Sequence, residues 1–176
     1  GQEMPSAIIS QIVKKKDFCI GSHRSHAQFL AKGGSINKML AEIYGKETGC
    51  SSGKGGSMHL IDLNVNFMGS SAIVGNSIPI GVGLGFSNKL KSDKKLTLIF
   101  FGDGAVEEGV FYESVNFAVL KKLPTIFICE NNYYSVYSPL KVRQPENRKI
   151  HKMVKGLGLK SYYFDMNDIF QTYKDL

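Results

Sequence analysis

The sequence contains little cysteine and no long apolar run, and both absences narrow the class of protein. Its three cysteines show no spacing typical of a metal site, and this small, odd number gives no basis for a disulfide framework. Such cysteine usage favours a reducing compartment, here the cytoplasm. The longest apolar stretch, about residues 72–86, is too short for a membrane span and is interrupted by Asn76 and Pro79. With no recognisable signal peptide, we expect a soluble cytoplasmic protein without a membrane partner.

The chain also lacks a massed patch of positive charge, although its formal net charge is +7. The densest basic groups, residues 14–16 and 89–95, are not accompanied by a recognition helix or by a platform of stacking aromatic side chains. Lysine groups of this kind are typical of a solvated surface. We therefore expect no nucleic-acid partner.

The length of 176 residues and the apolar fraction of 43% are typical of one globular domain, and no internal repeat or low-complexity tract is visible. A helical stripe of apolar side chains, which includes Ile8 and Ile12, begins almost at the first residue. At the other end a helical pattern starts at about residue 168, shortly before the sequence stops. We therefore expect a single domain, residues 1–176, that is truncated at both ends.

Two short apolar runs, residues 96–101 and 124–129, flank an amphipathic segment over 107–121 with helical periodicity. This order predicts a strand–helix–strand unit whose strands are parallel and buried. A brief strand is also predicted at residues 18–20. The fold class that we predict is α/β, with an open, mostly parallel sheet flanked by helices.

Weaker patterns predict the remaining elements. Ser35 is expected to cap a helix that runs to Ile43 and has one apolar face. In the C-terminal part we expect a helix over residues 147–155 and a strand over 159–164, followed by the helix that starts at residue 168.

Two glycine-containing segments resemble nucleotide-binding motifs without matching them. Residues 45–58 lack the glycine spacing and the Ser or Thr of a phosphate-binding loop, so a plain flexible loop is one interpretation. The glycines at 81, 83 and 85 also have the wrong spacing for a dinucleotide fingerprint, and no strand leading into a tight turn is expected before them. Gly81 and Gly85 instead predict close packing of a helix.

Polar residues occur where each main strand is predicted to end. Gly102-Asp103-Gly104 follows the first strand, and Asn132 follows the second. Because parallel strands end at one edge of the sheet, Asp103 and Asn132 are expected to be neighbours there. Their oxygens suit a hard cation such as Mg²⁺, Gly104 permits close approach of a ligand, and a helix starting at Ala105 favours an anion. The pair predicts a metal–diphosphate site, whereas Gly-Asp-Gly alone is typical of a tight turn.

A second polar group, residues 21–26, follows the strand predicted at 18–20. Arg24 is suited to binding a phosphate oxygen through its fork of N–H donors. His26 lies two residues further on, so both side chains face one cavity if the backbone is extended.

Gly-Asp-Gly followed at this distance by Asn-Asn resembles the thiamine-diphosphate-binding motif. The wider sequence resembles the alpha subunit of the decarboxylating component of 2-oxo acid dehydrogenase complexes, a family that includes pyruvate, branched-chain and acetoin dehydrogenases. The resemblance extends over nearly the whole chain, and the blocks that carry it are residues 1–3, 22–26, 53–59, 72–75 and 130–132.

The resemblance implies a set of site residues. It implies that Mg²⁺ is bound by Asp103, Asn132 and the main-chain carbonyl of Tyr134. It further implies catalytic His26 and a thiamine diphosphate site formed by His23, Arg24, Ala72, Val74, Asp103, Gly104, Ala105, Asn132 and Tyr134. Ala72 replaces the glycine usual in the family, and His23 stands where pyruvate-type members have tyrosine. The second difference favours an acetoin-like enzyme slightly over a pyruvate enzyme.

The resemblance also implies an activity and its partners. These are oxidative decarboxylation of a 2-oxo acid or cleavage of acetoin, with acyl transfer to lipoamide on a lipoyl-bearing acyltransferase. A beta subunit would supply the activating glutamate in an alpha2beta2 heterotetramer, and residues 45–58 would be an ordered loop near the cofactor and that subunit. Two alternatives remain: a transketolase-like thiamine diphosphate enzyme, and a non-catalytic interaction protein that retains the fold.

Overall fold

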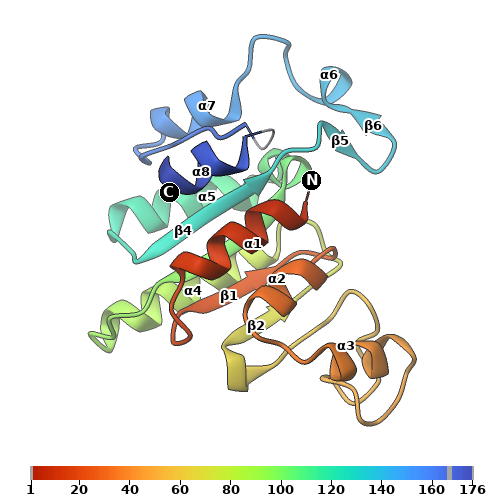
Figure 1. Cartoon of the computed structure of the whole chain (residues 1–176). Helices are drawn as coiled ribbons and strands as arrows, with labels where there is room; N and C mark the ends of the chain where they lie inside the picture. The colour runs from red at the N-terminus through yellow and green to blue at the C-terminus, as the bar shows by residue number, and fades with distance from the viewer. Residues whose placement is uncertain (1, 166–167, 176) are drawn as a thin grey trace.

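The computed structural model describes residues 2–165 and 168–175, and its centre is a four-stranded parallel sheet (Figure 1). The strands are β1 (Phe18–Gly21), β2 (Phe67–Ser70), β3 (Thr97–Gly102) and β4 (Thr125–Glu130), in the order β2-β1-β3-β4. All three neighbouring pairs are parallel. This confirms the predicted α/β class and the open parallel sheet.

Helices cover both faces of the sheet (Figure 1). Cys19, Leu98 and Phe100 belong to a core cluster with residues of α2 (His26–Ala31) and α3 (Ile36–Ile43), against which α1 (Glu3–Ile12) also packs. Their neighbours in the same strands, such as Ile99 and Phe101, belong to a second cluster with α4 (Ser77–Leu90) and α5 (Gly109–Leu120). This division follows from the alternation of side chains along a strand.

The helix α3 begins as predicted, because the Ser35 side chain accepts a hydrogen bond from the Lys38 N–H. Its apolar face is only partly buried. Met39 is in the core, whereas Ile36 and Leu40 are 56% and 45% exposed. The amphipathic pattern therefore identified the helix but not the extent of its burial within this chain.

The glycines of α4 allow the helix to lie directly on the sheet. A Cβ atom added at Gly81 would lie 2.5 Å from Cγ1 of buried Ile99, and one at Gly85 would collide with the Thr125 side chain. This confirms the prediction of close packing. The strand β2 precedes these glycines, but it ends at Ser70 and residues 71–76, rather than a tight turn, lead to the start of α4 at Ser77.

The C-terminal part departs furthest from the predictions. Residues 159–164 form no strand, and Tyr162 and Tyr163 are mostly exposed. A strand needs a hydrogen-bonded neighbour as well as β-forming residues, and among the described residues this segment has none. The predicted helices are present as α7 (Ile150–Gly156), three residues late, and α8 (Ile169–Asp175).

Between β4 and α7 the chain forms a small hairpin, with strands β5 (Tyr134–Ser135) and β6 (Ser138–Pro139), that leads into the one-turn helix α6 (Leu140–Arg143). Two 3-10 turns complete the elements, η1 (Leu63–Val65) and η2 (Asp103–Glu107). None of the helices among the described residues combines the length and the hydrophobicity needed to cross a membrane.

We predict that Gly81→Ala destabilises the fold, because the new methyl group would press on Ile99 and Ile20, neither of which has free space around it. Overpacking of this kind costs about 1–3 kcal/mol in the free energy of unfolding, which urea denaturation measures. The matched control is Gly83→Ala in the same helix, where an added Cβ meets no atom within 4 Å. That change should stabilise the helix by about 0.5–1 kcal/mol, and equal effects at both positions would contradict this account of the packing.

Candidate functional site

The candidate site lies at the carboxyl edge of the sheet, where the parallel neighbours β3 and β4 end. Gly102, the last residue of β3, pairs with Glu130, the last residue of β4. Asp103 and Asn132 therefore leave the sheet at the same edge from adjacent strands, as the strand pattern predicts. Asp103 is 1% exposed, whereas the side chain of Asn132 is at the surface.

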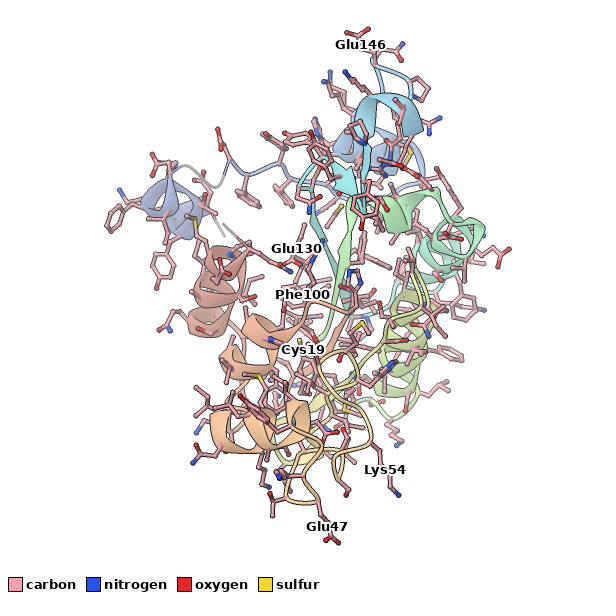
Figure 2. All side chains as sticks on the ribbon, turned by 90° about the vertical axis from the view of Figure 1, so that its right-hand side faces the viewer. Cys19, Glu47, Lys54, Phe100, Glu130 and Glu146 are labelled. Atoms are coloured by element: carbon pink, nitrogen blue, oxygen red, sulfur yellow. The ribbon has the colours of Figure 1, made fainter. Side chains whose placement is uncertain are left out.

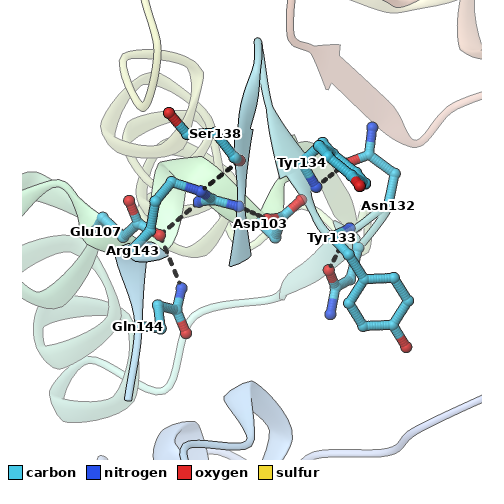
Figure 3. Close-up of polar contacts among 9 residues, drawn as sticks. Asp103, Glu107, Asn132, Tyr133, Tyr134, Ser138, Arg143 and Gln144 are labelled. Carbon is cyan, nitrogen blue, oxygen red and sulfur yellow. Dashed lines mark hydrogen bonds and ion pairs between the residues drawn. The ribbon is translucent and has the colours of Figure 1, made fainter. Parts of the chain in front are cut away.

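The carboxylate of Asp103 forms an ion pair with the guanidinium of Arg143. The same guanidinium lies 2.5 Å from Oε1 of Glu107, and its Nε donates to the Ser138 carbonyl at 3.1 Å (Figure 3). Gln144 Nε2 also donates to Glu107 Oε1, at 3.0 Å. Arg143 thus joins α6 to both carboxylates of η2, a connection that the sequence did not reveal.

The two asparagines form consecutive side-chain turns. Asn131 Oδ1 accepts from the Tyr133 N–H at 3.0 Å, and Asn132 Oδ1 accepts from the Tyr134 N–H at 2.9 Å (Figure 3). Asn132 therefore forms a turn, but a carboxamide oxygen has two lone pairs, so this hydrogen bond leaves one available to a cation. Tyr134 itself belongs to β5, where it pairs with Pro139.

Gly104 lies close against the hairpin that follows β4. A Cβ atom at this position would lie 2.7 Å from Oγ of Ser135. The helical segment that was expected from Ala105 onward is instead divided into the 3-10 turn η2 and, after extended Glu108, the helix α5. The regular α-helix therefore begins at Gly109, five residues after Gly104, and the free amide groups near Asp103 belong to η2.

Residues after β1 approach the same edge from the other side of β3. Gln2 Nε2 donates to the Arg24 carbonyl at 2.9 Å and to Glu130 Oε2 at 3.1 Å, while Gln28 Nε2 donates to Glu130 Oε1 at 2.8 Å. Burial raises the pKa of Glu130 to about 7, against the opposing effect of these two amides. Burial also lowers the pKa of His23, and the nearby Arg24 lowers it further.

His26 has a different set of polar contacts. It begins α2, and its Nε2 is 2.9 Å from Oγ of Ser57 and 3.1 Å from the Ser57 carbonyl. It therefore contacts the glycine-rich loop rather than Asp103. Ala72 and Val74, in the segment before α4, are partly buried and exposed, respectively.

The glycine-rich loop, residues 45–58, is organised around one carboxylate. Glu42 is fully buried and accepts four backbone hydrogen bonds, from the N–H groups of Ser51 (2.7 Å), Gly53 (2.9 Å), Gly55 (2.7 Å) and Gly56 (3.2 Å). These donors lower the pKa of Glu42, although its burial acts in the opposite direction. These hydrogen bonds favour the ordered loop over a plain flexible one, whereas its location near a cofactor and a second subunit stays a prediction. Lys54 in this loop lies at one end of the molecule and Glu146 at the other, with Glu130 between them (Figure 2).

The donor set at the edge fits a cation held mainly by oxygen. Among the described residues there is no group of three or more His, Cys, Asp or Glu side chains that could form a metal site. A cation bound by Asp103 would therefore need neutral oxygens, as Asn132 and a main-chain carbonyl would provide. Five buried side-chain oxygens among the described residues have no hydrogen-bond partner, and one of them, Gln144 Oε1, belongs to the side chain whose Nε2 donates to Glu107. This single atom is consistent with a polar ligand near η2.

A parallel sheet with polar residues at adjacent strand ends is the arrangement of a ligand-binding α/β domain. Residues 1–174 match the family described as Dehydrogenase E1 component. The chain is 39% identical over 173 residues to the pyruvate dehydrogenase E1 component subunit alpha of Rickettsia felis, covering 98% of this chain and 53% of the relative. It is 41% identical over 136 residues to the mitochondrial subunit alpha-2 of Arabidopsis thaliana, covering 77% and 35%.

The chain therefore belongs to the dehydrogenase E1 component family, which confirms the resemblance seen in its motifs. It spans about half the length of the rickettsial relative.

We predict that Glu42→Gln weakens the fold and loosens residues 45–58, because the amide can no longer accept four hydrogen bonds as an anion. A hydrogen bond to a charged group contributes about 1.5–3 kcal/mol, so urea denaturation at pH 7 should show a loss of at least that size. The matched control is Glu47→Gln on the exposed part of the same loop, which should have little effect.

The difference in the free energy of unfolding between the wild-type protein and Glu42→Gln should become smaller as the pH is lowered. Because the pKa of Glu42 is lowered on folding, its stabilising effect is complete above the ordinary carboxyl pKa of 4.5 and is lost as the pH falls below it. A difference that stays constant or grows below that pH would contradict the assignment.

Proposed function

We propose that this chain is the thiamine-diphosphate-holding part of an alpha subunit that acts in the oxidative decarboxylation of a 2-oxo acid. The observation that carries the proposal is the placement of Asp103 and Asn132 at the ends of adjacent parallel strands. Membership of the dehydrogenase E1 component family supports it. Residues 1–176 would form one domain of a longer polypeptide.

In this proposal the side chains of Asp103 and Asn132 and the carbonyl of Tyr134 hold Mg²⁺. Gly104 and Ala105 face the diphosphate, which His23 and Arg24 also contact, and backbone atoms of Ala72 and Val74 hold the cofactor's ring. When bound, thiamine diphosphate supplies the electron sink that allows a bond next to a carbonyl to break. The protein contributes orientation and charge balance.

His26 has a less direct part in the proposal. Its contact with Ser57 joins α2 to the glycine-rich loop through Nε2, so Nδ1 is the ring nitrogen that a role at the reacting atoms would use. We therefore propose His26 as a catalytic residue whose position is set by residues 45–58.

The substrate that we favour is pyruvate, because the relatives named above are pyruvate dehydrogenase subunits. Acetoin is the second candidate, since His23 occupies the position where pyruvate-type members have tyrosine. The partners in this proposal are a beta subunit in an alpha2beta2 heterotetramer and a lipoyl-bearing acyltransferase. The free cysteines among the described residues are consistent with the cytoplasm.

We predict that Mg²⁺ and thiamine diphosphate together stabilise the full-length gene product. A ligand that binds only the folded state raises the free energy of unfolding by about 2.7 kcal/mol at a hundredfold excess over its dissociation constant.

We predict that Asp103→Asn weakens cofactor binding at least about 10–100-fold, because a loss of this size is found even when the residue removed only hydrogen-bonds to a metal ligand. The control is Asp93→Asn, an exposed carboxylate paired with Lys95, and thermal denaturation with and without the ligands makes the comparison. An unchanged melting temperature in the wild-type protein would favour the non-catalytic alternative.

We predict that the full-length gene product is inactive alone and oxidatively decarboxylates pyruvate once a cognate beta subunit is added. The physical reason is that, in this proposal, residues of this chain hold the cofactor whereas the activating glutamate belongs to the beta subunit. Product formation from pyruvate, branched 2-oxo acids, acetoin and sugar phosphates is measured in parallel. Turnover of sugar phosphates without lipoamide would support the transketolase-like alternative instead.

A further inference from the structure

The carboxylate of Asp103 is neutralised by a positively charged side chain of the same chain, Arg143. Asp103 is 1% exposed, and a carboxylate so deeply buried is costly unless a cation neutralises it. Arg143 provides that charge, and its own side chain is 10% exposed. Arg143 therefore holds an oxygen that any metal ion at Asp103 would also need.

The segment that carries Arg143 is lightly attached to the rest of the molecule. Arg143 is the last residue of the four-residue helix α6, which follows a hairpin of two two-residue strands. The side chains of Val136, Tyr137 and Val142 are 82%, 92% and 69% exposed, so few buried apolar contacts fix this segment. Segments of this kind open at low free-energy cost.

Glu107 gives the guanidinium a second attachment. Its Oε1 lies 2.5 Å from Nη1 of Arg143, whereas Asp103 is contacted by Nη2. Arg143 can therefore release Asp103 while one side of its fork remains on Glu107. The fork geometry that suits a carboxylate also suits a phosphate, so the freed side could bind a phosphate oxygen without a change of partner type.

We propose that Arg143 is an exchangeable counter-ion of the site, which neutralises Asp103 when no metal ion is bound and transfers to the diphosphate when Mg²⁺ takes its place. This inference rests on the proposed function, because it assumes that Asp103 binds the metal. Residues 134–143, which form the hairpin and α6, move with Arg143. When Mg²⁺ displaces Arg143 from Asp103, this segment therefore closes over the diphosphate.

The exchange predicts opposite effects of one substitution on two ligands. In Arg143→Ala, Mg²⁺ alone should bind about tenfold more tightly, because its competitor for Asp103 is gone. Magnesium pyrophosphate should bind about tenfold more weakly, because a charge-assisted hydrogen bond to phosphate is lost. Both affinities are measured by isothermal titration calorimetry on the full-length gene product. The matched control is Arg148→Ala, an exposed arginine five residues further along, which should change neither affinity.

Two further measurements keep the test independent of folding defects. Arg143→Lys keeps the charge but loses the fork, so Mg²⁺ affinity should stay near the wild-type value while pyrophosphate affinity falls. Hydrogen–deuterium exchange of residues 134–143 in the wild-type protein should increase with Mg²⁺ alone and decrease when pyrophosphate is added.

The possible outcomes separate this inference from the proposed function. If the wild-type protein binds both ligands and Arg143→Ala weakens both or changes neither, Arg143 is only a structural residue and the exchange is refuted. If the wild-type protein binds neither ligand, the metal–diphosphate function fails, and the exchange fails with it.

Discussion

The parallel pairing of β3 with β4 is the constraint on which the candidate site depends. It aligns Gly102 with Glu130, so that the residues after each strand enter the same space. Close contact between α4 and the sheet maintains this arrangement, because Gly81 and Gly85 let the helix backbone lie on Ile99 and Thr125. The positions of Asp103 and Asn132 therefore depend on the packing of α4 against the middle of the sheet.

Buried carboxylates organise the rest of the molecule, each through a different kind of partner. Asp103 is matched by a guanidinium, Glu130 by the amides of Gln2 and Gln28, and Glu42 by backbone N–H groups. Burial raises the pKa of Glu130 in spite of its amide partners, whereas the four backbone donors lower the pKa of Glu42 in spite of its burial. These two carboxylates of one domain thus differ in protonation behaviour, because burial prevails at Glu130 and hydrogen-bond donors prevail at Glu42.

The features that the sequence predicted are those with a local pattern. The strands around Asp103 and Asn132 follow from apolar runs bounded by polar residues, and the cap at Ser35 follows from its neighbours. Arg143 could not be found in this way, because it contacts Asp103 across forty positions from a segment without periodicity. Glu42 was missed because no sequence pattern shows which carboxylate a glycine-rich loop will enclose. Residues 159–164 have the composition of a strand, but composition does not supply a hydrogen-bonding neighbour.

The carboxylate of Glu42 also bears on the thermodynamics of assembly. A loop so rich in glycine would normally lose much conformational entropy when another molecule binds to it. Here the four N–H groups are fixed when the chain folds, with no external anion involved. Any molecule that binds residues 45–58 therefore meets a preorganised surface, and its affinity is not reduced by the need to order the loop.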